Sequence, residues 1–270
     1  GQIATSDDSV TIADPAGNTD TTEKTGLTID NAAPSNPASG PDLQTGSDTG
    51  ISTTDDVTSD TTPTFDVTCT EAGSTITLYS DNPAANTVIG THTCVGVGTE
   101  VVTVSPAIAD GTHNVSYTET DVAGNKTTKS PSLTINIDST APVGTGTPDL
   151  QAGSDTGSST TDDITSDSTP SFDIACANGN VVTLYTDNPA ANTVVGTGAC
   201  AGGSVTILPS LAIADGNYNF HASETDPAGN IGANSGVLGV VLIDTGIPNA
   251  PASGPDLQTG SDTGTSSTDD

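Results

Sequence analysis

The stretch PDLQTGSDTGISTTDDVTSDTTPTFDVTC at residues 41–69 returns as PDLQAGSDTGSSTTDDITSDSTPSFDIAC at residues 148–176. A third copy of the opening, PDLQTGSDTG, starts at Pro255, so successive copies start 107 residues apart. This period is too long for the unit of a solenoid and has the size of a small domain. The chain is therefore a series of domain repeats. A functional site that belongs to the repeat should be present in both complete copies.

Hydrophobic residues occupy alternate positions after each acidic opening. Phe65, Val67 and Cys69 alternate with polar residues, which is the pattern of a half-buried β-strand. Turn residues such as Asp110-Gly111 separate further strands of this kind, and no segment has a helical period. The predicted strands of the first repeat are 64–69, 74–80, 87–94, 100–105, 112–120 and 132–138. About seven short strands per repeat predict an all-β chain of antiparallel β-sandwiches.

The period divides the chain into four parts. Residues 41–147 and 148–254 are complete repeats. Residues 1–40 are interpreted as the C-terminal part of a preceding repeat with its linker, and residues 255–270 as the start of a following repeat. The last strands lead into short D-x-x-x-P linkers, at Asp30–Pro34, Asp138–Pro142 and Asp244–Pro248. Short linkers that contain proline are expected to be semi-rigid.

The charge of the chain excludes several classes of partner. The net charge is −31, with 34 acidic residues against three lysines. Nothing is available to neutralise phosphates, so nucleic acid is excluded, and anionic membrane surfaces are disfavoured for the same reason. No stretch is long and apolar enough to insert into a membrane. Such an acidic surface attracts cations, and divalent cations most strongly.

The four cysteines occupy matching places in the two repeats. Cys69 and Cys94 lie in the first repeat, and Cys176 and Cys200 in the second. The absence of C-x-x-C pairs with neighbouring histidines disfavours zinc, which leaves one disulfide per repeat or four buried thiols. A disulfide closing a loop of this length stabilises a domain by roughly 3.5 kcal/mol. Disulfides place the chain outside the cytosol.

The ordered set of motifs resembles a known family. The motifs are PDLQxGSDTG, the run TTDDVTSDTTPTF or TTDDITSDSTPSF, the D-x-A-G-N turn and a final strand running into D-x-T-A-P. Together they resemble the bacterial Ig-like tandem repeats of giant extracellular adhesins and biofilm-type surface proteins. The resemblance implies tandem Ig-like β-sandwiches at the cell surface that act as spacers, often stiffened by calcium at the domain junctions. The cysteine pair is not a usual feature of that family.

The histidines do not recur between the repeats. His92 aligns with a glycine, His113 with Tyr218, and His221 with Ser116. A catalytic device that one repeat lacks is improbable, so these are interpreted as strand or surface histidines, and no enzyme activity is expected.

The carboxylates do recur, and they are the candidate metal ligands. Calcium takes six to eight oxygen ligands from carboxylates, amides and carbonyls. We expect a structural calcium at each junction, where Asp138 would meet the next repeat's cluster from Asp155 to Asp167 and a nearby loop. The alternative is a solvated acidic surface with aspartates in turns. The candidate ligands are Asp48, Asp55, Asp56, Asp60, Glu119, Asp121 and Asp138 in the first repeat, and Asp155, Asp162, Asp163, Asp167, Glu224, Asp226 and Asp244 in the second.

These observations predict an extender or stalk repeat of a long extracellular surface protein or filament, supporting adhesion or fibre formation. The expected partners are adjacent repeats of the same chain, with neighbouring copies in a fibre as a further candidate. Two alternatives stay open: a carbohydrate- or ligand-binding Ig-like module, and a passive linker of a secreted enzyme. Aromatic residues make up only 3% of the chain, which disfavours the binding module.

Overall fold

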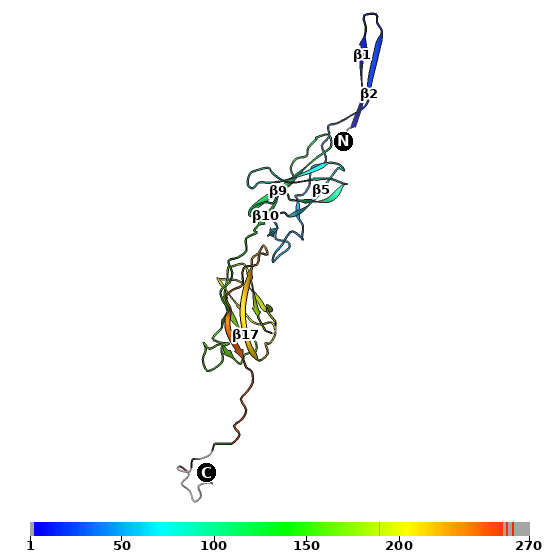
Figure 1. Ribbon diagram of the computed structural model, residues 1–270. Coiled ribbons are helices and arrows are strands. Elements are labelled where there is room, and N and C mark those ends of the chain that lie inside the picture. Colours follow the sequence, from blue (N-terminus) through cyan, green and yellow to red (C-terminus); the bar gives the residue numbers. More distant parts are fainter. Residues whose placement is uncertain (1–2, 189, 256–257, 259–260, 262–270) are drawn as a thin grey trace.

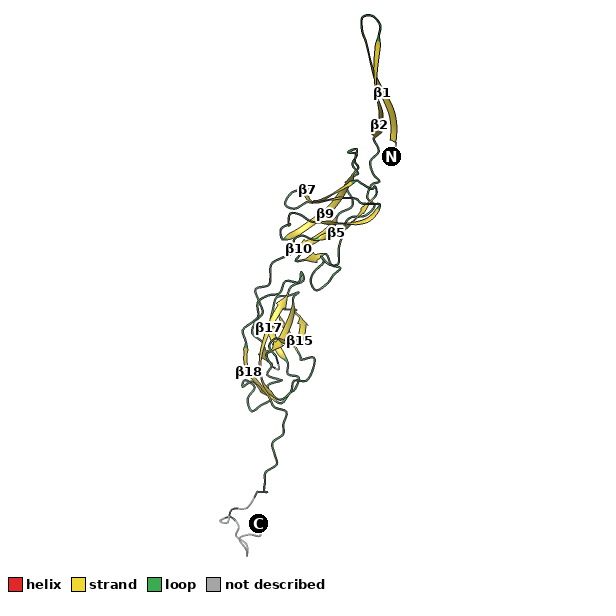
Figure 2. Cartoon of the chain, turned by 45° about the vertical axis from the view of Figure 1, so that its right-hand side comes forward, coloured by secondary structure: helices red, strands yellow, loops and turns green. Residues whose placement is uncertain are grey.

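The computed structural model describes residues 3–188, 190–255, 258 and 261. A β-hairpin projects from one end, two β-sandwiches follow one another along the same direction, and an extended segment leaves the second sandwich (Figure 1). The described residues form strands, turns and loops (Figure 2). No helix of a length and hydrophobicity that could cross a membrane occurs among them. The all-β prediction is confirmed.

The hairpin consists of β1 (Ile3–Ala13) and β2 (Thr19–Asp30), which pair antiparallel with each other alone. Its tip has the sequence Asp14-Pro15-Ala16-Gly17-Asn18, the D-x-A-G-N turn of the repeats. In each complete repeat this turn follows the long strand that leads to the final strand. The hairpin therefore has the turn sequence that joins the last two strands of each complete repeat.

The first sandwich is built from two sheets. One sheet has the order β3-β5-β8 and the other β4-β10-β9-β6-β7. All pairings are antiparallel except that of β4 with β10, which is parallel. The strands are β3 (Asp42–Leu43), β4 (Val57–Thr58), β5 (Thr64–Cys69), β6 (Thr75–Ser80), β7 (Thr87–Thr93), β8 (Gly98–Thr103), β9 (Gly111–Thr120) and β10 (Leu133–Ile137).

The second sandwich repeats this topology, with the orders β11-β13-β16 and β12-β18-β17-β14-β15. The recurrence of the whole strand order confirms that the sequence repeat is a repeat of domains. The strands are β11 (Asp149–Leu150), β12 (Ile164–Thr165), β13 (Phe172–Ala175), β14 (Val181–Thr186), β15 (Thr193–Ala199), β16 (Ser204–Ile207), β17 (Gly216–Thr225) and β18 (Leu238–Ile243).

The alternating residues of the strands form the cores. Phe65, Val67 and Cys69 point inward from β5, while the residues between them are partly or fully exposed. Phe172 and Ile174 repeat this pattern on β13. The predicted strands agree with the observed ones to within two residues at each end, because strict alternation marks a strand that has one face in the core.

The acidic opening of each repeat contributes two short strands that the alternation does not reveal. β3 and β4 are two residues long each, and the loop between them carries Asp48 and Asp56. The parallel pairing of β4 with β10 returns this loop to the end of the sandwich from which the chain leaves. We call residues 44–56 and 151–163 the lead-in loops of the first and second repeats.

Candidate cation site and repeat junction

Both predicted disulfides are present. Cys69 bonds to Cys94, and Cys176 to Cys200, with Cα–Cα distances of 5.9 and 6.0 Å. Cys69 ends β5 of the three-stranded sheet, whereas Cys94 follows β7 of the five-stranded sheet. Each disulfide therefore connects the two sheets of its own sandwich.

Asp48 in the first lead-in loop has an unusual environment. The carbonyl oxygen of Gln44 accepts hydrogen bonds from the main-chain N–H groups of Ser47 and Asp48, and this turn directs the Asp48 side chain inward. Asp48 is 3% exposed. Its Oδ2 atom accepts a long hydrogen bond of 3.5 Å from Asp56 N, and its Oδ1 atom has no hydrogen-bond partner among the described residues. A buried carboxylate oxygen without a partner is costly, so this atom fits a cation as its ligand.

Further carboxylates stand close to Asp48. Burial raises the pKa of Asp48, and the carboxylate of Asp55 adds to this rise. Burial also raises the pKa of Asp56, and the charges of Asp48, Asp42 and Asp55 raise it further. Asp56 has a φ of 59°, in the left-handed region. The loop therefore holds carboxylates close together at a cost in free energy. A bound positive ion would reduce the repulsion between them.

The second repeat has the same arrangement. Asp155 is 3% exposed, its Oδ2 accepts a 3.3 Å hydrogen bond from Asp163 N, and its Oδ1 has no partner in the part of the chain that the structure describes. Asp163 has a φ of 58°. Burial raises the pKa of Asp163, as do the charges of Asp155, Asp149 and Asp162. Both repeats therefore retain the same energetically unfavourable pair of carboxylates, which makes the pair a recurring feature of the repeat.

The carboxylates do not by themselves complete a cage for a metal ion. Within the described part of the chain, no three acidic, histidine or cysteine side chains converge closely enough to hold one. Calcium accepts main-chain carbonyl oxygens and water as further ligands, and the lead-in loop can supply carbonyls. Asp48 with Asp56, and Asp155 with Asp163, are therefore the core of the candidate site.

Asp60 and Asp167 lie next to these loops but have partners of their own. The Oδ1 atoms of Asp60 and Asp167 accept hydrogen bonds of 2.8 Å from the main-chain N–H groups of Thr62 and Thr169. Ser47 Oγ donates to Asp60 Oδ2 at 3.0 Å. Both aspartates thus stabilise the turn that precedes the next strand.

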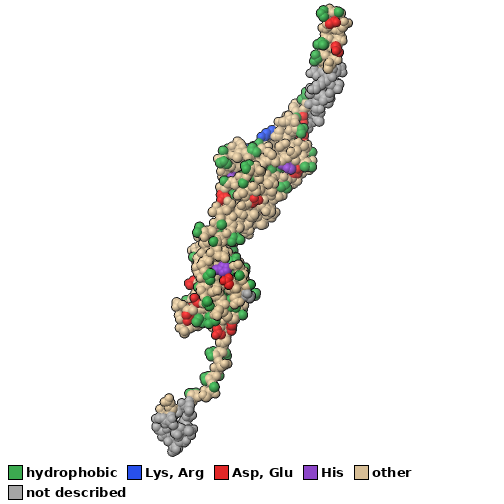
Figure 3. All heavy atoms as spheres, in the orientation of Figure 1, with side chains coloured by type: hydrophobic (Ala, Val, Ile, Leu, Met, Phe, Trp, Pro, Cys, Tyr) green, Lys and Arg blue, Asp and Glu red, His purple; other side chains and the backbone are tan. Residues whose placement is uncertain are grey.

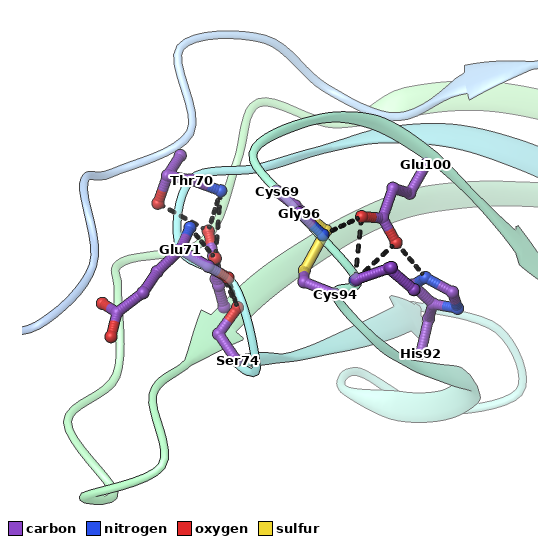
Figure 4. Close-up of polar contacts among 10 residues, drawn as sticks. Cys69, Thr70, Glu71, Ser74, His92, Cys94, Gly96 and Glu100 are labelled. Atoms are coloured by element: carbon purple, nitrogen blue, oxygen red, sulfur yellow. Dashed lines mark hydrogen bonds and ion pairs between the residues drawn. A yellow bond between two sulfur atoms is a disulfide. The ribbon is translucent and has the colours of Figure 1, made fainter.

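The glutamates predicted as ligands lie at the other end of each sandwich. Glu119 is fully buried and accepts hydrogen bonds from Thr70 N, Glu71 N and Ser74 Oγ (Figure 4). Glu224 accepts a 3.0 Å hydrogen bond from Ala177 N. They hold the turn that follows β5 or β13, beside the disulfide, at the end of the sandwich away from the lead-in loop of their own repeat.

Asp121 and Asp226 begin the D-x-A-G-N turns at that same end. Asn125 donates from its main-chain N to Asp121 Oδ1 at 2.8 Å and from Nδ2 to Asp121 Oδ2 at 2.9 Å. The side-chain hydrogen bond from Asn125 is the main cause of a lowered pKa for Asp121. Asp226 and Asn230 make the same pair of bonds. These aspartates therefore act as turn residues, the role that Ala-Gly-Asn predicts.

Asp138 is not placed as the sequence analysis expected. Its main-chain N donates to Thr58 O at 2.9 Å, so it lies beside the lead-in loop of its own repeat. Asp244 donates in the same way to Thr165 O, which puts the cluster from Asp155 to Asp167 at the far end of the second repeat. The parallel pairing of β4 with β10 causes this, because it sends each lead-in loop to the exit end of its own sandwich. Figure 3 shows acidic side chains near that exit end of the second repeat.

The junction between the repeats is formed by the lead-in loop of the first and the turn Asp226–Asn230 of the second. Thr49 Oγ1 donates to Ala228 O at 2.8 Å, and Ile51 N donates to Pro227 O at 3.3 Å. Ala228 is only 1% exposed. Asn230 Nδ2 adds a 2.7 Å bond to the carbonyl oxygen of Asp138, just as Asn125 bonds to Asp30 O. Asp48 therefore directly precedes the segment that contacts the next repeat.

Gly50 and Gly229 allow this close approach. A Cβ atom on Gly50 would lie 2.1 Å from Pro227 O, and one on Gly229 would lie 2.8 Å from the Cα of Gly50. Both residues have positive φ angles, of 112° and 94°. This contact was not predicted from the sequence, although SDTG and A-G-N recur with their glycines in every copy.

The histidines are held in structural contacts. His113 on β9 bonds to Ser80 Oγ and Ala109 O, and His221 on β17 bonds to Asn192 Oδ1. His92 lies 2.5 Å from Glu100, whose carboxylate also accepts the N–H groups of Val95 and Gly96 (Figure 4). These contacts, with His92 the largest cause, lower the pKa of Glu100 to about 2 from 4.5.

We expect Glu100→Gln to lower the melting temperature of the first repeat by a few degrees at neutral pH. Because the pKa of Glu100 is lower in the folded protein, the contribution of its carboxylate to stability is fully present above pH 4.5, its ordinary pKa. This contribution is lost as the pH falls through about 2. The difference between the two proteins should therefore shrink over that range in thermal unfolding followed by circular dichroism. Glu71→Gln is the control, because that carboxylate points away from these contacts (Figure 4). A difference in melting temperature between the parent and Glu100→Gln that does not change with pH would contradict the stabilising role of the Glu100 carboxylate.

Residues 35–139 and 141–245 each match the family model described as bacterial Ig-like domain. The chain belongs to the bacterial Ig-like domain family. Its two bacterial Ig-like repeats thus coincide with the two sandwiches. No curated protein matches the chain.

Several solved structures are similar to the two bacterial Ig-like repeats. The FN1–FN3 domains of chicken CNTN1 are 13% identical with a TM-score of 0.49, over 87% of this chain and 74% of that one. A structure concerning a 1.5-MDa bacterial ice-binding adhesin is 22% identical with a TM-score of 0.34, over 87% and 72%. The BSP domain of a biofilm associated protein is 18% identical with a TM-score of 0.26, over 71% of this chain. The chain spans only 29% of the length of that last protein.

Proposed function

We propose that the two repeats are extender units of a long extracellular surface protein, which supports adhesion or the formation of a surface fibre. The direct hydrogen bonds between the first lead-in loop and the turn Asp226–Asn230 carry this proposal. They hold consecutive sandwiches end to end, which is what a spacer needs. One disulfide in each unit connects its two sheets, and this supports an extracellular setting.

Buried aromatic residues favour the extender over the ligand-binding alternative. A carbohydrate-binding module needs aromatic faces that a sugar can contact. Phe65, Phe172, Phe220 and Tyr117 are all fully buried, and Tyr218 is 7% exposed. Five of the seven aromatic side chains therefore serve the cores, and the other two, Tyr79 and Tyr185, pack against Lys126 and His221.

We further propose that calcium stiffens each junction. Asp48 with Asp56 and main-chain carbonyls of the first lead-in loop would hold one ion, and Asp155 with Asp163 and carbonyls of the second lead-in loop another. The bound ion would supply the positive charge that the partnerless oxygens of Asp48 and Asp155 lack. Because Asp48 is followed directly by Thr49 and Gly50, fixing its side chain would also fix the segment that contacts the next repeat.

Calorimetric titration of the metal-free chain with calcium tests this proposal. We expect two binding events, of which Asp48→Asn removes one and Asp155→Asn the other. Asp66→Asn is the matched control, because Asp66 lies on β5 and its carboxylate accepts a hydrogen bond from Gln44. Absence of binding heat, or binding unchanged in both site variants, would refute the calcium site and leave the extender role to the disulfides and the junction contacts.

A further inference from the structure

The second repeat has an apolar groove beside β15, the edge strand of its five-stranded sheet. The groove has a volume of 510 Å³ and lies between β15, the start of β17 and the segment that connects β16 to β17. Val195, Ile213 and Tyr218 line it. Val194 and Leu211 also line it and are 57% and 80% exposed. A groove of this size and composition suits a small ligand.

The first repeat has a groove of 280 Å³ at the same place. Tyr218 Oη donates to Ala214 O at 2.8 Å and so holds the segment that borders the second groove. His113, at the matching position of β9, donates from Nε2 to Ala109 O at 2.8 Å. The groove is therefore built in the same way in both repeats.

Neighbouring repeats leave the grooves open. The first groove is open although the second repeat follows it, and the second groove is open although the first repeat precedes it. The junction is formed by the first lead-in loop and the turn Asp226–Asn230, and none of the described residues that line either groove belongs to these two segments. A groove on the side of a repeat thus stays accessible when repeats follow one another in series.

The second groove also contains a carboxylate. Asp215 lines it, and Asp215 Oδ1 accepts hydrogen bonds from the main-chain N and Oγ1 of Thr245, at 3.0 and 2.8 Å. The bond from the Thr245 side chain is the main cause of a lowered pKa for Asp215, so this carboxylate is charged at neutral pH. Asp215 Oδ2 has no hydrogen-bond partner among the described residues.

The matching aspartate of the first repeat is arranged differently. Asp110 Oδ1 accepts a 2.7 Å hydrogen bond from Ser139 Oγ, and Asp110 Oδ2 accepts a 2.9 Å bond from Thr140 Oγ1. Asp110 is not among the described residues that line the first groove. Of the two grooves, the second therefore combines the larger apolar surface with a carboxylate oxygen that can accept from a ligand.

We propose that the groove of the second repeat binds a small apolar amine, whose apolar part contacts Leu211 and Ile213 and whose ammonium group pairs with Asp215 Oδ2. The charge of the chain supports a cation, because a net charge of −31 repels anions. The apolar lining disfavours a sugar, since several hydroxyl groups would lose their hydrogen bonds to water. This binding function is separate from the extender role and does not depend on calcium.

NMR titration of the whole chain, followed by the main-chain amide signals, tests the proposal. Three probes share one apolar body and differ in charge: phenethylamine, 2-phenylethanol and 3-phenylpropionate. We expect phenethylamine to shift the amide signals of residues 211–218 with the weak affinity of a fragment of its size. The alcohol should bind about fivefold more weakly, which is the contribution of an exposed ion pair, and the anion should not shift these signals.

Two variants, each with a matched control, separate the charge from the apolar surface. Asp215→Asn keeps an acceptor for Thr245 and removes the charge, so amine affinity should fall to that of the alcohol, while Asp110→Asn should bind like the parent. Leu211→Asn should weaken the amine and the alcohol by a similar factor. Leu208→Asn is its control, because Leu208 is 58% exposed and is not among the described residues that line the groove.

Four results would overturn the proposal. The first is the absence of amide shifts at the groove at any amine concentration, and the second is equal binding of the amine and the alcohol to the parent chain. The third is a set of shifts spread over the acidic residues of both repeats, which would indicate attraction to charge alone. The fourth is a peptide, Gly-Phe-Lys-Gly, that binds more tightly than the amine, because the groove would then belong to a segment of a partner protein.

Discussion

Replacing Cys69 and Cys94 together by alanine is expected to lower the free energy of unfolding of the first repeat by about 3.5 kcal/mol. The disulfide closes a loop between the two sheets and so restricts the unfolded chain. Both cysteines are buried in a core that has few aromatic residues, at 0% and 2% exposure, so their loss also removes packing. For a domain of this size the melting temperature should fall by about 20 °C.

Scanning calorimetry of the two-repeat chain measures this effect. The Cys69→Ala, Cys94→Ala variant should lower the transition of the first repeat, and the matched Cys176→Ala, Cys200→Ala variant that of the second. A reducing agent should lower both transitions in the parent chain and only the remaining one in each variant. A loss below about 1 kcal/mol would show that the cores do not depend on these crosslinks.

Gly50→Ala is expected to disconnect the two repeats without unfolding either. The added Cβ atom would lie 2.1 Å from Pro227 O, and alanine at a φ of 112° is strained by about 1–3 kcal/mol. The steric overlap and the backbone strain can be relieved only if the lead-in loop moves away from the turn Asp226–Asn230. The hydrogen bonds from Thr49 and Ile51 to the second repeat would then be lost.

Distances between spin labels, one in each repeat, report this change. In calcium, the parent chain should give a narrow distribution of label-to-label distances, and Gly50→Ala a broad one. Gly46→Ala is the matched control in the same loop, because a Cβ atom there would meet nothing within 4 Å. A narrow distribution in Gly50→Ala would contradict the proposed role of the glycine contact.

Most of the fold could be predicted from the sequence, because the information is local. Alternation such as that of Phe65, Val67 and Cys69 fixes which face of a strand is buried, and the internal repeat fixes the number of domains. The strands β3 and β4 were not predicted, since two residues cannot show a period. Their pairing decides where each lead-in loop lies, and this is why the expected position of Asp138 was wrong.

The candidate site was predicted only as a set of carboxylates. Composition cannot tell Asp48, whose Oδ1 is buried without a partner, from Asp60, whose carboxylate caps a turn. That difference depends on which main-chain N–H groups are nearby, and those are placed by the folded loop. Glu119 was assigned to the metal because it recurs, yet it recurs because the turn after β5 needs its carboxylate.

We propose that bound calcium holds consecutive repeats at a fixed angle. The label-to-label distance distribution of the parent chain, measured in calcium and then in EDTA, tests this proposal. We predict a narrow distribution in calcium that broadens in EDTA and narrows again when calcium is restored, with Asp48→Asn broad in both. A distribution that is equally narrow in calcium and in EDTA would contradict the claim.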